Sequence, residues 1–343
     1  MEINRAYFVK KIQDEDATYR FWRPFVDWMF RRSYRRIQYV GRENVPADGA
    51  VIFAPNHVNA LNDAMAVLGI DSRPKVFAAR ADIFNNPKRA RLLRFFKILP
   101  IRRMRDGAQE VLHNDATERE AIDAMQSDVP FVILPEGTHR TKHSLLPLKK
   151  GIFRIALRAN DEFGDKRPVY IVPVGLEYGN YFHLWDNLTV NIGQPINVTE
   201  FVRNHSDLDR GHMILALREE LTHRMQQQIL WVPDDEHYEQ NWQRLKQNPP
   251  QPFTTMKHHR LPKWLLIILL ILTSPLFIIS AAVTAPLWLI LLLTRIVIRD
   301  PAFYNSVQYV VQLVALPATL FLQAPFWIFF QEYGFQLRLL KEK

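Results

Sequence analysis

Strand-like and helix-like segments alternate through residues 37–250, and this alternation limits the possible folds more than any other feature of the chain. Short apolar runs that favour strands stand at residues 50–54, 75–79, 98–101, 130–134, 168–174 and 188–192. Between them lie helical patterns, notably at residues 107–126, 151–160 and 209–231. Strands that alternate with helices usually pair in parallel. The sequence therefore predicts an α/β domain with a largely parallel sheet flanked by helices.

Polar or special residues follow four of these apolar runs. His57, Arg102, Glu136 and Gly175 each come directly after a predicted strand. In sheets of parallel strands, ligands bind at the carboxyl ends of the strands. We therefore expect these four positions to lie in loops around one site.

An amphipathic helix is predicted at residues 16–36. Aromatic rings recur there at helical spacing, and arginines surround and follow them. An interfacial membrane helix has this composition, because rings prefer the headgroup level and guanidinium groups bind anionic lipids. The alternative is a helix that buries its aromatic stripe against the domain. We assign residues 1–40 to this region.

The C-terminal quarter is strongly apolar. Residues 264–294 contain no charge, and prolines interrupt the run at Pro275 and Pro286. One straight helix of this length would measure roughly 46 Å, against about 30 Å of hydrocarbon in a bilayer. A tilted span or a hairpin of two shorter helices would fit, and a second apolar stretch follows at residues 307–330. The sequence thus predicts a membrane-embedded region at 246–343, after an α/β domain at 41–245.

Charge and cysteine content restrict the function classes. The chain has 44 Lys and Arg against 35 Asp and Glu, a balance that favours phosphorylated ligands or anionic membranes. Nucleic acid is not an expected partner, because no zinc-ligand spacing or RNA-binding aromatic motif occurs. The absence of cysteine excludes thiolate catalysis and Cys-based metal sites. Because no uninterrupted apolar run follows the start, we expect no cleaved signal peptide and a catalytic domain on the cytoplasmic face of a membrane.

His57 and Asp63 are the candidate catalytic residues. An imidazole titrates near neutral pH, so His57 suits a general base, and Asp63 would orient it and stabilise the imidazolium. Six positions along a regular helix separate two side chains by about 240°. The turn between the two residues must therefore fold back if they are to meet. The alternative is that His57 packs against the following helix and Asp63 is a solvated helix residue.

Four blocks of the sequence resemble the glycerol-phosphate acyltransferase family, which includes the lysophosphatidate acyltransferases. They are Asn56-His57 with Asp63, the apolar strand that ends in Arg102-Arg103, Pro135-Glu136-Gly137-Thr138, and Val172-Pro173-Val174-Gly175. The blocks occur in the family's order over about residues 50–180. The resemblance implies a membrane-bound enzyme of phospholipid biosynthesis. Such an enzyme moves an acyl chain from acyl-CoA or acyl carrier protein to lysophosphatidate, which gives phosphatidic acid, or to glycerol-3-phosphate.

The resemblance also implies substrate-binding roles. Glu136 and Gly137 would bind the acceptor, and Arg102 or Arg103 its phosphate, which guanidinium groups match bidentately. Further substrate-binding candidates are Thr138, Arg140 and Lys149. The implied reaction uses the acceptor's own hydroxyl as nucleophile, so it needs neither a metal nor a cofactor.

The chain departs from the common family pattern at two places. Five residues separate His57 from Asp63 instead of four, which resembles the branch of yeast-type glycerol-3-phosphate and dihydroxyacetone-phosphate acyltransferases. His139 stands where the family usually has arginine, and Arg140 comes next. The acceptor therefore stays open.

Two other functions compete with acyl transfer. The first is a membrane-tethered, metal-dependent phosphohydrolase with His57, Asp63, Glu136 and His139 as metal ligands. The second is a non-catalytic lipid-binding protein that retains the same fold. Both would keep membrane lipids as partners.

Overall fold

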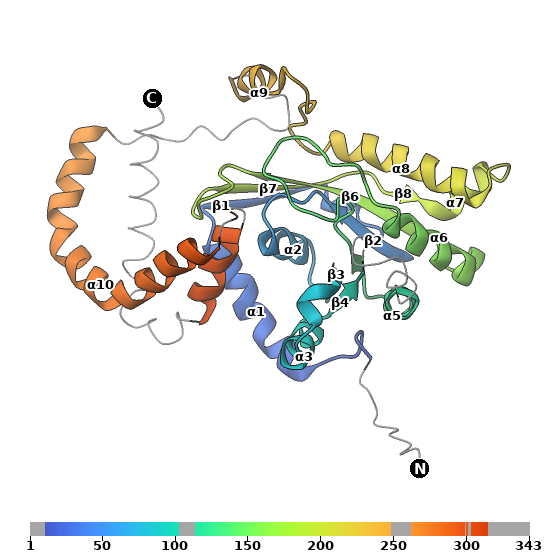
Figure 1. Ribbon diagram of the computed structural model, residues 1–343, viewed down its shortest axis with the longest axis horizontal. Helices are drawn as coiled ribbons and strands as arrows, with labels where there is room; N and C mark the ends of the chain where they lie inside the picture. The colour runs from blue at the N-terminus through green and yellow to red at the C-terminus, as the bar shows by residue number, and fades with distance from the viewer. Residues whose placement is uncertain (1–10, 103–113, 248–261, 299, 301–302, 315–343) are drawn as a thin grey trace, which may run out of the picture.

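The computed structural model describes residues 11–102, 114–247, 262–298, 300 and 303–314. Within them a single sheet forms the centre of the molecule, with strand order β1-β7-β6-β2-β5-β3-β4 and β8 beside β6 (Figure 1). The strands are β1 Arg36–Val40, β2 Ala50–Pro55, β3 Val76–Arg80, β4 Ile98–Ile101, β5 Phe131–Val132, β6 Val169–Tyr178, β7 Asn187–Ile192 and β8 Ile196–Asn197.

The sheet is mostly parallel, which confirms the predicted fold class. β2 pairs in parallel with β5 and β6, β3 with β4 and β5, and β1 with β7. Only β7 and β8 run antiparallel to their neighbour β6. All six predicted strands are present, β4 with the predicted ends and the others with shifted ends. The short β8 was missed, as was β1, whose first residue, Arg36, continues an arginine-rich helix pattern.

Helices lie on both faces of the sheet (Figure 1). They are α1 Ala17–Arg32, α2 Leu61–Leu68, α3 Pro87–Phe95, α5 Asn114–Gln126, α6 Gly151–Phe163, α7 Val198–Asn204, α8 Arg210–Gln226, α9 Tyr238–Gln247 and α10 Lys263–Val297. Residues 304–314 are helical as well. The predicted helix at 107–126 corresponds to α5, and its residues 107–113 lie outside the described part of the chain.

The alternation of side chains along β2 explains why both faces are covered. Ile52 belongs to the core cluster that includes residues of α5, α6 and α8, whereas Val51 and Phe53 belong to the cluster on the side of α1 and α2. All six residues of β2 are buried. A parallel strand covered on both faces reads as a continuous apolar run, which is how this segment could be recognised.

The aromatic face of α1 is divided between the core and solvent. Phe30 is buried and packs in the cluster beside α2, whereas Phe21, Trp22 and Trp28 are 74%, 48% and 42% exposed. Asp16 caps the helix by accepting from the backbone N–H of the residues two and three positions on. The interpretation of a helix buried against the domain is therefore confirmed for Phe30, whereas membrane contact by the exposed rings stays a prediction.

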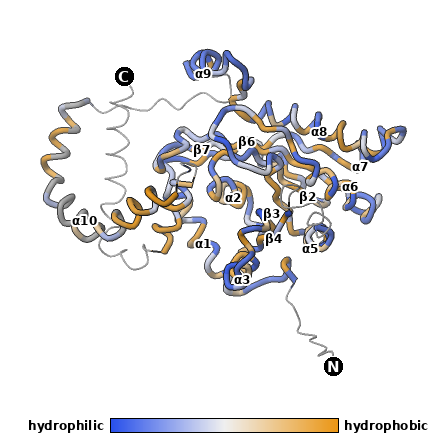
Figure 2. The backbone as a smooth tube through the Cα atoms, viewed as in Figure 1, coloured by the Kyte–Doolittle hydropathy of each residue, from blue (hydrophilic) through white to orange (hydrophobic). Residues whose placement is uncertain are grey.

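The membrane-embedded C-terminal region is not confirmed. In the described ranges, no helix combines the length and apolar character that crossing a bilayer requires. α10 nevertheless carries many exposed apolar side chains, among them Trp264, Leu272 and Ile296 at 63%, 69% and 71%, and Figure 2 shows its apolar stretches. Most of the second apolar stretch, residues 315–330, lies outside the described residues.

Gly175 does not lie in a loop, which corrects the expectation for the fourth block. It sits inside β6, which continues to Tyr178. A Cβ on Gly175 would stand 2.0 Å from the carbonyl oxygen of Gln228. The glycine is therefore needed for the close approach of the segment after α8 to the sheet, rather than for a ligand.

We predict that Gly175→Ala lowers the free energy of unfolding by about 1–3 kcal/mol, because the backbone of Gln228 must move. Gly151→Ala is the matched control. Its new Cβ would meet no atom within 4 Å at the start of α6, so it should be neutral or stabilise by about 0.4–1 kcal/mol. Urea unfolding of both variants checks this, and equal effects would contradict it.

Candidate active site

His57 and Asp63 meet directly. Nδ1 of His57 lies 2.8 Å from Oδ2 of Asp63. The His57 side chain is 18% exposed and that of Asp63 is fully buried. A carboxylate accepts from Nδ1–H, so Nε2 carries the lone pair and can take a proton. The alternative of a solvated Asp63 is wrong.

Four hydrogen-bond donors surround the Asp63 carboxylate. Oδ2 accepts from His57 and from the backbone N–H groups of Val58 and Asn59, at 2.8 and 2.7 Å. Oδ1 accepts from the hydroxyl of Tyr178 at 2.8 Å. Burial, and then the charge of Asp63, raise the pKa of Tyr178 well above its usual value, so the phenol stays a donor. This set of donors stabilises a buried negative charge.

The turn between the two residues folds back at Ala60. β2 ends at Pro55 and α2 begins at Leu61, and between them Ala60 has φ 46° and ψ −118°. A positive φ is unusual for alanine and reverses the chain here. As a result Asp63, in the first turn of α2, points back at the histidine instead of lying 240° away from it.

Glu136 supports the loop of His57 from behind. Its Oε1 accepts the backbone N–H of His57 and its Oε2 that of Leu146, both at 2.8 Å. Both carboxylate oxygens thus bind the backbone, and the residue is only 2% exposed, whereas a contact of Glu136 with an acceptor stays a prediction. Burial raises the pKa of Glu136 to about 7, and the two N–H groups oppose this shift.

The other predicted substrate-binding residues are spread around this loop. Gly137 has φ +69° in the turn after Glu136 and lies beside Lys149. Thr138 and Lys149 are exposed, so their side chains are accessible to a ligand. Arg102 follows β4 and bonds through its backbone to Asn114, whereas Arg103 lies outside the described residues.

Arg140 points away from His57. Its guanidinium group pairs with Asp234 and donates to Ser144 Oγ at 2.6 Å, while its backbone N–H donates to the carbonyl of His57. Arg140 therefore fastens the loop to the segment before α9. It does not take the place of the arginine that the family pattern leads one to expect at position 139.

One residue that contacts Asp63, Tyr178, was not identified as a site residue from the sequence. It lies on the same face of β6 as Val174 and Leu176, toward α2, and this period-2 pattern could have revealed it. His139, which the sequence suggested only as a metal ligand, also lies near His57. Its ring centroid is 5.5 Å from that of His57, and its Nε2 is 2.7 Å from Asp300 Oδ2.

The residues proposed as metal ligands do not fit a metal. Oxygen atoms of Asp63 and Glu136 already accept from N–H and O–H donors, which a bound cation would have to displace. Over the ranges that the structure describes, no group of three or more possible ligands is placed around a common point. The phosphohydrolase alternative therefore loses its ligand set.

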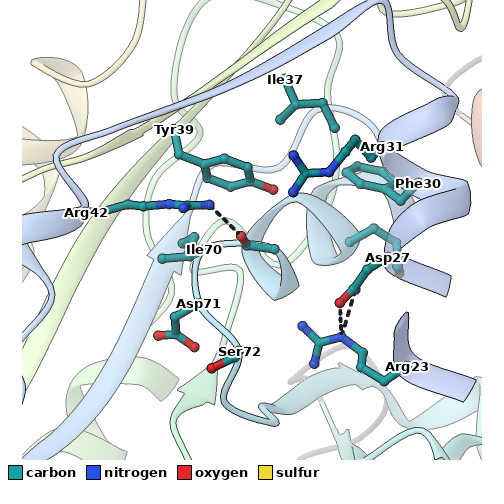
Figure 3. A pocket seen from close by; sticks show the side chains of 12 residues that line it. Arg23, Asp27, Phe30, Arg31, Ile37, Tyr39, Arg42, Ile70, Asp71 and Ser72 are labelled. Atoms are coloured by element: carbon teal, nitrogen blue, oxygen red, sulfur yellow. Dashed lines mark hydrogen bonds and ion pairs between the residues drawn. The ribbon is translucent and has the colours of Figure 1, made fainter. Parts of the chain in front are cut away.

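A cavity of about 230 Å³ lies away from the catalytic pair, between α1, β1 and the end of α2 (Figure 3). Two arginines at its wall bond the last carbonyls of α2: Arg23 donates to Leu68 and Arg42 to Gly69. Cations at a helix C-terminus stabilise the helix. The arginines at this cavity therefore stabilise the end of α2, the helix that carries Asp63, and neither His57 nor Asp63 lines the cavity.

We predict a pH-dependent stability difference between the wild type and Glu136→Gln. A folded-state pKa of about 7, above the ordinary 4.5, means that the folded protein holds a proton which the unfolded chain has lost. The stabilisation is complete below pH 4.5 and is lost as pH rises through 7, so the wild type should lose up to about 3 kcal/mol relative to the variant.

Urea unfolding at several pH values between 4.5 and 7.5 measures this difference. Glu219→Gln, an exposed glutamate on α8, is the control and should follow the wild type. Parallel stability curves for Glu136→Gln and the wild type would show that Glu136 has no raised pKa.

Comparison with known proteins gives one family match within the chain. Residues 36–177 match the family model Acyltransferase. Among solved structures, the 1-acyl-sn-glycerophosphate (LPA) acyltransferase PlsC from Thermotoga maritima is similar at 19% identity, with a TM-score of 0.43, over 62% of this chain and 82% of that one. No curated protein matches the chain. The matched residues include both His57 and Asp63, and the match agrees with the family resemblance of the sequence blocks.

Proposed function

We propose that this protein transfers an acyl chain from an acyl thioester to a hydroxyl group of a phosphorylated glycerol acceptor. The observation that carries the proposal is the His57–Asp63 pair, 2.8 Å apart, inside the region that matches the acyltransferase family. The pair combines an accessible base with a buried orienting charge, and acyl transfer to a hydroxyl needs both.

In this mechanism Nε2 of His57 removes the proton from the acceptor hydroxyl as its oxygen attacks the thioester carbonyl carbon. Asp63 stabilises the imidazolium that forms. The tetrahedral intermediate then collapses, the carbon–sulfur bond breaks, and the thiolate takes the proton from His57. One ester forms, one thioester is lost, and no group on the protein is acylated.

The acceptor in this proposal is lysophosphatidate or glycerol-3-phosphate, and the donor is acyl-CoA or acyl carrier protein. A phosphate monoester carries nearly two negative charges, so it needs cations near the base. Lys149 is an exposed cation beside the Gly137 turn. Arg102 directly follows β4, at the carboxyl end of that strand. We assign the phosphate to these residues.

We further propose that the enzyme works at a membrane, with the catalytic domain on the cytoplasmic side. The exposed rings of α1 and the exposed apolar side chains of α10 support this assignment. Each would be covered by lipid at an interface. Acyl chains and the acylated product also partition into lipid, so a site beside the bilayer shortens their transfer.

We predict that His57→Ala lowers kcat by roughly 10²–10⁴, because it removes the base. The variant should still fold, because Val58, Asn59 and Tyr178 still donate to Asp63. The assay uses purified, detergent-solubilised chain with labelled acyl-CoA, or acyl carrier protein, and both acceptors in parallel. His212→Ala is the matched control. Its Nδ1 lies 2.7 Å from Asp209 in a second His–Asp pair that is exposed, so activity should be unchanged.

Turnover that survives in His57→Ala would exclude His57 as the base. No transfer to either acceptor from either donor, with intact lipid binding, would instead favour the non-catalytic lipid-binding protein.

We predict that Lys149→Ala raises KM for the phosphorylated acceptor about tenfold while kcat changes less than twofold, because a charge that binds phosphate before and during the reaction contributes uniform binding. Lys166→Ala removes an exposed lysine after α6 and serves as control. Steady-state kinetics at varied acceptor concentration measures the effect. An unchanged KM would place the phosphate elsewhere.

A further inference from the structure

The helix at residues 304–314 contacts the turn between His57 and Asp63 (the catalytic turn), although it follows α10 and lies outside the matched family region. Ser306 Oγ accepts the backbone N–H of Leu61 at 3.2 Å and donates to the carbonyl of Asn59 at 3.5 Å. These two groups flank Ala60, where the chain reverses. Ser306 is 5% exposed, so its hydrogen bonds are shielded from water.

The catalytic turn lacks a cap of its own. The residue before α2 is Ala60, and no side chain of this turn accepts from the first N–H groups of the helix. Free N–H groups at a helix start need acceptors, and serine is among the preferred ones. Ser306 supplies this acceptor from a position 245 residues away in sequence.

A second group of contacts anchors the helix that carries Ser306. Asn305 Nδ2 donates to the carbonyl of Tyr181 at 2.9 Å, and Asn59 Nδ2 donates to the same oxygen at 3.3 Å. Tyr309, 1% exposed, donates to the carbonyl of Val26 in α1 at 3.1 Å. The helix at 304–314 is thus fixed on one side to α1 and on the other to the turn.

Two residues that precede this helix contact His139, the neighbour of His57. Asp300 pairs with His139, and the ring of Phe303 packs edge-on against His139 at 4.8 Å between centroids. His139 in turn lies edge-on to His57. This part of the chain therefore contacts the surroundings of His57 twice. Ser306 bonds the turn after His57, and Asp300 and Phe303 contact His139 beside it.

We propose that Asp300 and residues 303–314 are a positioning element of the active site, in which Ser306 holds the turn that places His57 against Asp63. Ser306 acts through the backbone of Asn59 and Leu61. The kinetic consequence rests on the proposed function, whereas the structural consequence does not. The two can therefore be tested separately.

The structural test is amide hydrogen exchange, followed by mass spectrometry, on the full detergent-solubilised chain. Ser306→Ala should speed exchange of the amides at residues 58–63 by tenfold or more, because Leu61 loses its acceptor and the turn opens more often. Ser127→Ala removes an exposed hydroxyl just after α5 that donates to the carbonyl of Asp123 in that helix, and it should leave this peptide unchanged. Equal exchange in Ser306→Ala and the wild type would overturn the proposal.

If Ser306→Ala does not fold, Ser306→Cys provides the same test, because a thiol fills similar space and is a weak hydrogen-bonding group. Faster exchange confined to residues 58–63 supports the proposal. Faster exchange spread over the whole domain would mean that Ser306 is only a stability residue.

The kinetic test is a double-mutant cycle with Asp63→Asn. We expect Ser306→Ala to lower kcat about tenfold with KM for the donor unchanged within twofold, and to cause less than a twofold further loss when Asp63 is already replaced. Losses that multiply in the double variant would overturn positioning through the His57–Asp63 pair. If the wild type shows no acyl transfer, the proposed function fails, and the exchange experiment alone decides on Ser306.

Discussion

The site depends on the burial of one carboxylate. An ionised carboxylate without partners cannot be kept in the interior of a protein, and four donors together satisfy the buried Asp63. These donors come from the histidine, from the backbone of the turn and from Tyr178 on β6. Hydrogen bonds to the same carboxylate consequently hold the turn, β6 and His57 together.

The parallel sheet supplies the next layer of support. Because β2 lies between β5 and β6, the loop of His57 is held from both neighbours. Glu136, after β5, accepts its backbone N–H, and Asn56 exchanges two hydrogen bonds with Leu176 of β6. Neither contact touches a substrate. Both show why residues within a recognisable sequence block can be needed for shape rather than for binding.

The sequence allowed prediction of the sheet and of the catalytic pair, because apolar runs and a His–Asp motif are local patterns. It did not reveal the direction of Glu136, since a glutamate in a glycine turn reads the same whether it faces a ligand or the backbone. The positive φ at Ala60 was hidden because alanine carries no turn preference. Ser306 was hidden because its partners lie 245 and 247 positions away.

The position of Ser306 has a consequence for the order of synthesis. The chain is made from the N-terminus, and every residue of the matched family region precedes α10. The catalytic turn nevertheless receives its cap from a helix that follows α10. A nascent chain therefore cannot form this cap until the whole of α10 has left the ribosome. In the proposed enzyme, the site is thus completed only after a helix with many exposed apolar side chains has been made.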